Sequence, residues 1–320
     1  MACEQPEAAV EAAGRADVDV VVHAVSGAAG LSASFAAAEA GKRICLANKE
    51  SLVCGGELLL KAVEAGGAEL LPIDSEHSAL HQCARAGRTD EIDRLILTAS
   101  GGPFRDAEAW PTERMERATV ADAMNHPTWN MGGKNTLDSA TLFNKALEVI
   151  EAAVLFGVPA DKIDVVIHPQ SVVHSMIEFR DGSTIAQLTP PDMRGPIAYA
   201  LCYPHRREAG VPRLDLTAAF SLDFSPPDPE RFPALTLAKQ ALDAGGTAPL
   251  VLNAANEVAG AAFRERQIGF NDISRVVVET MLSCGVEAAG SLRDLLDADA
   301  EARQCAQAAV ERLAGATAGR

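Results

Sequence analysis

The chain has 320 residues, of which 48% are hydrophobic and 22% charged, a balance typical of a globular protein with a sizeable core. Its formal net charge of −16 disfavours nucleic acid as a partner, because a phosphate backbone needs a basic surface. No apolar run approaches the length needed to span a bilayer. We therefore expect neither nucleic acid nor a membrane among its partners.

The start of the chain carries the acidic residues Glu4, Glu7 and Glu11, so it does not resemble a signal peptide. The cysteines are odd in number, far apart and without paired metal-binding spacing. We expect them to be reduced thiols in a cytoplasmic protein. They are Cys3, Cys45, Cys54, Cys83, Cys202, Cys284 and Cys305.

Three short apolar runs, at 17–25, 43–47 and 69–73, predict buried parallel strands. Each is followed by a helical pattern, and the three helices are expected to end near residues 39, 64 and 85. This alternation predicts an α/β fold with a doubly wound sheet. Ligands of such sheets bind beyond the carboxyl ends of the strands. Gly27, Asn48-Lys49-Glu50 and Asp74-Ser75-Glu76 fall at that edge.

The middle of the chain predicts a second sheet. Residues 93–105 indicate a strand that ends in a Gly-rich turn, whose amides and Ser100 hydroxyl suit a phosphate; an ordinary strand-to-loop turn is the alternative. Three further β-like runs follow, with the last two joined by Asp181-Gly182, a hairpin signal. We expect an antiparallel sheet here. The runs are 163–168, 172–180 and 183–189.

Residues 126–151 predict a loop followed by a helix with Asp138 or Ser139 as its N-cap. Asn144, Lys145 and Glu148 share one side of that helix. The helix start, with its free amides and positive dipole end, suits an anion. The alternative is a surface helix with a solvated polar stripe.

Two carboxylates, Asp74 and Glu76, follow one strand and would repel each other unless a cation lay between them. Oxygen ligands select Mg²⁺ or Mn²⁺ over zinc, and Glu148 is the best candidate for a third ligand. His77 and His81, four apart, suggest either zinc or a packed helix face. Lys49 is a candidate cation or proton donor, or else an exposed loop lysine.

Six motifs stand in the order found in 1-deoxy-D-xylulose 5-phosphate reductoisomerases, and the chain resembles that family over almost its whole length. They are LANKESLV (46–53), LPIDSEHSA (71–79), SGGPFR (100–105), DSATLFNKALE (138–148), IHPQSVVHSM (167–176) and LNAANE (252–257).

The resemblance implies a cytoplasmic homodimer of the non-mevalonate isoprenoid pathway. It would be an NADP-dependent oxidoreductase and isomerase that makes 2-C-methyl-D-erythritol 4-phosphate from its sugar phosphate substrate. The cofactors implied are NADPH and Mg²⁺ or Mn²⁺, with Co²⁺ as a further possibility.

The resemblance also implies residue roles. Asp74, Glu76 and Glu148 match the metal ligands; Lys49, Ser75 and Glu76 match contacts to the reacting end of the sugar. His126 matches the histidine that closes on the substrate, with Trp129 and Met131 on a lid at 123–133. The catalytic set is Lys49, Glu76, His126 and Glu148; the phosphate pocket is Ser100, Ser139, Asn144 and Lys145; the nicotinamide-cofactor contacts are Asn48, Glu50 and Gly132.

The expected organisation is an incomplete Rossmann-like sheet, an α+β catalytic domain and a C-terminal helical bundle. The bounds are 1–73 for the NADPH-binding domain, 74–203 for the catalytic domain, 204–234 for a linker and 235–320 for the helical domain.

One departure from the family lies at the start. The Gly-x-Thr-Gly-Ser-Ile-Gly turn that grips the pyrophosphate is not among these residues, and Met1 aligns inside that domain. We therefore expect weak NADPH binding and an uncovered edge of the parallel sheet. Two rivals stay open: a non-catalytic remnant that binds metal and sugar phosphate but not NADPH, and a nicotinamide-independent isomerase or lyase.

Overall fold

A computed structural model describes residues 6–318 of the chain; Cys3 and Glu4 lie outside the described residues. The chain divides into two compact units. The first comprises Met1–Ala99 and Glu151–Pro226, and the second comprises Ser100–Ile150 and Pro227–Arg320. The domain bounds expected from the sequence stay a prediction.

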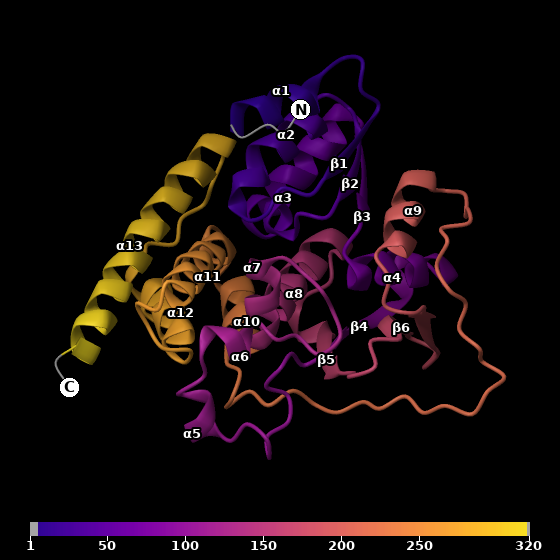
Figure 1. Cartoon of the computed structure of the whole chain (residues 1–320). Coiled ribbons are helices and arrows are strands. Elements are labelled where there is room, and N and C mark those ends of the chain that lie inside the picture. Colours follow the sequence, from indigo (N-terminus) through magenta and orange to yellow (C-terminus); the bar gives the residue numbers. More distant parts are fainter. Residues whose placement is uncertain (1–5, 319–320) are drawn as a thin grey trace. The chain divides into compact units, whose positions relative to one another are not determined.

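A three-stranded parallel sheet in the order β1-β2-β3 opens the first unit (Figure 1). The helices α2 and α3 connect its strands, as the alternation of patterns predicts. Helix α1, which was not predicted from the sequence, packs on α2. The elements are α1 (Pro6–Gly14), β1 (Val20–His23), α2 (Leu31–Glu39), β2 (Arg43–Leu46), α3 (Lys49–Gly66) and β3 (Glu69–Pro72).

Strand β1 lies at the edge of this sheet within the described part of the chain. Its Val20 and Val22 side chains are 38% and 51% exposed, whereas His23 is buried. An edge strand presents unpaired backbone groups, and here it also presents valines. Within the described residues no strand pairs with the outer side of β1, and the expectation of an uncovered edge stays a prediction.

The second sheet of the first unit has the order β5-β4-β6-β7. The Asp181-Gly182 hairpin between β6 and β7 is confirmed, and Gly182 has the positive φ of 84° that such a turn needs. The expected antiparallel sheet is wrong for β5, which pairs with β4 in parallel, because the long segment between these strands forms a crossover. The strands are β4 (Ile92–Ala99), β5 (Ile163–Ile167), β6 (Val173–Phe179) and β7 (Thr184–Leu188).

Two further helices position the first unit's polar residues. Helix α4 (Ser75–Cys83) follows β3 and packs on β6 and β7. Helix α9 (Arg194–Cys202), which was not predicted from the sequence, packs on α4 and β3. Residues 204–233 contain no helix or ladder strand, apart from a bridge of Ser225 to Ile167. That this segment is a linker between domains stays a prediction.

The second unit begins with short helices α5 (Thr112–Met115) and α6 (Val120–Ala123), followed by α7 (Gly133–Ala140) and α8 (Phe143–Phe156). The last residues of α8 belong to the first unit. The single helix expected over 138–151 is wrong, because Leu142 has a φ of 60° and breaks the helical path. Asp138 and Ser139 consequently lie inside α7 and cap neither helix.

Four helices complete the second unit and confirm the expected C-terminal bundle (Figure 1, orange to yellow). Ala302, Ala306 and Ala309 are fully buried, and these small side chains let α13 approach its neighbours closely. No helix in residues 6–318 combines the length and the hydropathy of a membrane span. The helices are α10 (Ala234–Ala244), α11 (Ala248–Arg264), α12 (Asp272–Ser283) and α13 (Leu292–Ala318).

Candidate active site

Lys49 and Asp74 form an ion pair at the carboxyl edge of the parallel sheet. Lys49 is the first residue of α3, and Asp74 lies directly before α4. Lys49 is only 5% exposed, so the reading of an exposed loop lysine is wrong. Burial alone would raise the pKa of the Asp74 carboxyl, but the charges of Lys49 and then His77 outweigh it and hold that pKa well below its usual value.

Ser75 and Glu76 occupy the first turn of α4, beside Asp74. The Ser75 hydroxyl donates to Oε2 of Glu76 at 2.5 Å, and both residues are half-buried. Negative side chains are favourable at a helix start. The first unit therefore offers two carboxylates and a hydroxyl at one strand end, a donor set of oxygens that suits Mg²⁺ or Mn²⁺.

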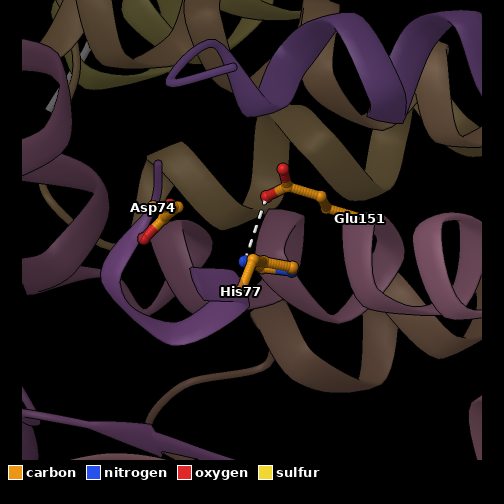
Figure 2. Close-up of side chains that lie close together, drawn as sticks. All are labelled: Asp74, His77 and Glu151. Carbon is orange, nitrogen blue, oxygen red and sulfur yellow. Dashed lines mark ion pairs between the residues drawn. The ribbon is translucent and has the colours of Figure 1, made fainter. Parts of the chain in front are cut away.

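Glu151 on α8 lies against α4, where its Oε2 is 3.2 Å from Nδ1 of His77 (Figure 2). Both side chains are essentially fully buried. Asp74 completes a cluster in which one donor atom of each residue lies within 4.8 Å of the others. Sequence reasoning missed Glu151, although its position three residues after Glu148, within an apolar helix, is a usable signal.

His81, the other histidine of α4, packs against aromatic rings. Its Nδ1 is 2.8 Å from the Tyr199 hydroxyl, and its ring also meets Tyr203 edge-on. Burial lowers the pKa of His81, and the charge of Arg85 acts in the same direction. Of the two readings for the histidine pair, His81 fits the packed helix face.

The expected cofactor contacts of the first unit lie at the start of α3, where Asn48 is the N-cap and Glu50 belongs to the first turn. The Asn48 amide nitrogen donates to the carbonyls of Val25 and Gly27 and to Oε2 of Glu50, and its oxygen accepts from Ser51 N. These contacts tie the turn after β1 to the turn after β2. A group of buried polar side chains therefore lies at the carboxyl ends of the strands, where proteins of this fold class bind their ligands.

In the second unit, Ser100 and His126 meet: the Ser100 Oγ lies 2.9 Å from Nε2 of His126. Nδ1 of His126 accepts from the amides of Thr128 and Trp129 at 3.1 and 2.8 Å. A neutral imidazole has one donor nitrogen, so Nε2 carries the proton and donates to Ser100. Burial, and next the charge of Arg105, lower the pKa of His126.

The Gly-rich turn after β4 lies directly against the end of α7. A Cβ on Gly102 would stand 2.5 Å from the carbonyl oxygen of Ser139, and Gly102 has a φ of 67°. Ser139 is 8% exposed. Only glycine fits this approach, which brings Ser100 and Ser139 into one region.

Asn144 and Lys145 both donate to Glu148 within the first turns of α8. The expectation that the three share one side of the helix is confirmed. Lys145 is 3% and Glu148 0% exposed, so the alternative of a solvated surface stripe is wrong.

The expected lid residues follow His126 in an irregular segment that ends at the start of α7. Trp129 and Met131 are half-buried, and Gly132 is exposed directly before α7. A Cβ on Gly132 would meet nothing within 4 Å. The segment thus leaves open space beside the backbone at Gly132.

Three family models match this chain. Residues 2–56 match the model "1-deoxy-D-xylulose 5-phosphate reductoisomerase", residues 70–156 match its C-terminal domain, and residues 188–305 match the "DXP reductoisomerase C-terminal domain".

Curated proteins and solved structures of that name are similar to the chain. The reductoisomerase of Chlorobium chlorochromatii is 54% identical over 91% of this chain and 75% of its own length, and that of Rhodospirillum centenum is 54% identical over 94% and 74%. The Zymomonas mobilis enzyme in complex with NADPH shows a TM-score of 0.88 at 46% identity, covering 96% of this chain and 78% of that one. A crystal structure of DOX-P reductoisomerase with NADPH, fosmidomycin and magnesium shows a TM-score of 0.90 at 45% identity, covering 95% and 79%.

Proposed function

Because the chain belongs to the family of 1-deoxy-D-xylulose 5-phosphate reductoisomerases, we propose that it converts this sugar phosphate to 2-C-methyl-D-erythritol 4-phosphate. NADPH would be the reductant, and Mg²⁺, Mn²⁺ or Co²⁺ the metal. Similar proteins in solved structures hold NADPH and magnesium, which supports the cofactors. A cytoplasmic homodimer is part of the same proposal.

The metal ligands we propose are Asp74, Glu76 and Glu148. The oxygen donors of Asp74 and Glu76 at the start of α4 fit a hard divalent ion. Glu148 precedes Glu151 by about one turn of α8, and Glu151 contacts His77 on α4. A bound ion would polarise the carbonyl oxygen of the substrate as a Lewis acid.

The phosphate would bind to Ser100, Ser139, Asn144 and Lys145. The single observation that carries the proposed function is the convergence of the Gly102 turn with Ser139 in the second unit. The two serine hydroxyls would donate to phosphate oxygens. So would the Asn144 amide and the Lys145 ammonium, which lie in the first turn of α8. This pocket would fix one end of the substrate and so orient the other.

At the reacting end, Lys49, Ser75 and Glu76 would contact the sugar oxygens. Lys49 is buried and held by Asp74, so its ammonium is oriented before substrate arrives. His126 would close on the substrate with Trp129 and Met131 above it, and this closure would exclude water. NADPH supplies a hydride when bound, and Asn48, Glu50 and Gly132 would contact it.

Lys145→Ala tests the phosphate pocket. We expect a higher dissociation constant for 1-deoxy-D-xylulose 5-phosphate and a nearly unchanged one for 1-deoxy-D-xylulose, because only the first carries the charge that Lys145 meets. Lys162→Ala is the control, since Lys162 belongs to the first unit and pairs there with Asp93. Equal losses for both ligands in Lys145→Ala would rule out a phosphate-specific role.

The alternative is a chain that binds metal and sugar phosphate but not NADPH. The exposed valines of β1 at the open sheet edge support it, because Asn48 and Glu50, two of the three proposed nicotinamide contacts, follow the neighbouring strand β2. A fluorescence titration of the chain with NADPH separates the two. Saturable micromolar binding supports the reductoisomerase, whereas no binding by a chain that still holds the sugar phosphate supports the alternative.

A further inference from the structure

The segment 252–257 of helix α11 has no part in the proposed chemistry, yet one of its residues reaches α7. Asn256 is 1% exposed, and its amide nitrogen donates to Oδ1 of Asp138 at 2.9 Å. The other carboxylate oxygen of Asp138 accepts from Nζ of Lys134 at 2.8 Å. Asp138 is 3% exposed, so this buried carboxylate is satisfied by an amide on one side and an ammonium on the other.

Asp138 directly precedes Ser139 in the last turn of α7. Beyond it, the Thr141 hydroxyl donates to the carbonyl of Asp138, and the amide of Leu142 donates to the carbonyl of Ser139. That same Ser139 carbonyl faces Gly102. The turn is thus tied by backbone contacts at Ser139, and by side-chain contacts at Asp138.

From these contacts we propose that Asn256 is a positioning residue for the phosphate pocket, a claim that rests on the proposed function. Its hydrogen bond from α11 holds Asp138, and through Asp138 it holds the end of α7 where Ser139 is presented. Asn256 itself does not touch the substrate. A hydrogen-bond donor suits this position, whereas a carboxylate at residue 256 would face the Asp138 carboxylate.

Asn253, one turn earlier on α11, is a matched control. It is fully buried, and its amide nitrogen donates to Oε1 of Glu257 at 3.0 Å. The other oxygen of Glu257 accepts from Arg303 on α13. Asn253→Ala therefore removes a buried side-chain hydrogen bond of the same kind from the same helix, but one whose acceptor is Glu257 and not Asp138.

The experiment compares Asn256→Ala with Asn253→Ala in the full chain by two measurements. The first is amide hydrogen exchange over residues 133–141. The second is the ratio of the dissociation constants for 1-deoxy-D-xylulose 5-phosphate and 1-deoxy-D-xylulose. We expect Asn256→Ala to speed exchange in α7. We also expect it to raise that ratio about tenfold, because binding of the phosphorylated ligand is weakened more. Asn253→Ala should leave both measurements at their wild-type values.

Asn256→Asp should do more harm than Asn256→Ala, because it sets two buried carboxylates against each other. The double variant Asp138→Asn with Asn256→Asp restores an amide facing a carboxylate, and should recover part of the lost ratio.

Three results would overturn the proposal. Unchanged exchange in α7 of Asn256→Ala would show that Asp138 is not held by this contact. An equal ratio in Asn256→Ala and Asn253→Ala would leave Asn256 a structural residue only. A wild-type chain that binds neither ligand would remove the proposed function, and the positioning claim with it.

Discussion

Gly102 and Ser139 approach so closely that a Cβ at residue 102 would stand 2.5 Å from the Ser139 carbonyl oxygen. Gly182 in the β6–β7 hairpin also has a positive φ, of 84°, but nothing lies within 4 Å of its Cβ position. Substitution of either glycine would therefore strain the backbone, but only at Gly102 would the new Cβ also clash with a neighbouring atom.

We predict that Gly182→Ala costs roughly 1 kcal/mol of unfolding free energy, and Gly102→Ala a further ~1–3 kcal/mol from the clash. Gly102→Ala should also weaken sugar phosphate binding, because Ser139 must move. Urea unfolding and calorimetric titration measure the two effects. Equal stabilities and equal affinities in the two variants would show that the close approach is unimportant.

The pH dependence of His126 follows from its surroundings. Burial and Arg105 lower its pKa below the ordinary histidine value, so the folded chain binds this proton less readily than the unfolded chain. The stability that neutral His126 contributes is therefore present above pH ~6.5, and is lost as the pH falls through the lowered pKa. Protonated Nδ1 can no longer accept from Thr128 and Trp129.

Proton NMR of the His126 ring should accordingly give a midpoint below the ordinary value. The fall in unfolding free energy on acidification should be smaller in His126→Asn than in wild type, since one titrating group is gone. A His126 midpoint at or above the ordinary value would show that its surroundings do not lower its pKa.

The proposed metal site predicts that Asp74→Asn and Glu148→Gln each weaken Mn²⁺ binding, because each removes a charged oxygen ligand. Calorimetry gives the affinity and the stoichiometry. Asp90→Asn is a suitable control, because Asp90 pairs with Arg88 at the surface. Unchanged affinity and stoichiometry in either ligand variant would remove that residue from the site.

Local signals in the sequence predicted much of the fold. Short apolar runs with a helix after each predicted the parallel sheet, and Asp181-Gly182 predicted the hairpin. The break between α7 and α8 was not predicted. Leu142 adopts a left-handed backbone conformation that leucine rarely takes, and no residue in this stretch signals it. The parallel pairing of β4 with β5 was not predicted either, because the pairing of distant segments does not show in the local sequence pattern.

The candidate site shows the same limit. Spacing alone placed Asn144, Lys145 and Glu148 on one side of a helix, which the hydrogen bonds confirm. The contacts of Glu151 with His77 and of Asn256 with Asp138 join residues far apart in the chain. Such contacts depend on tertiary packing, which periodicity does not encode.

Turnover by the purified chain would show whether the chain is a reductoisomerase. With 1-deoxy-D-xylulose 5-phosphate, Mn²⁺ and NADPH, we expect the NADPH absorbance to fall while 2-C-methyl-D-erythritol 4-phosphate forms, as measured by phosphorus NMR. We expect Asp74→Asn to lose this turnover. No NADPH oxidation by a wild-type chain that still binds Mn²⁺ and the sugar phosphate would contradict the proposed reductoisomerase.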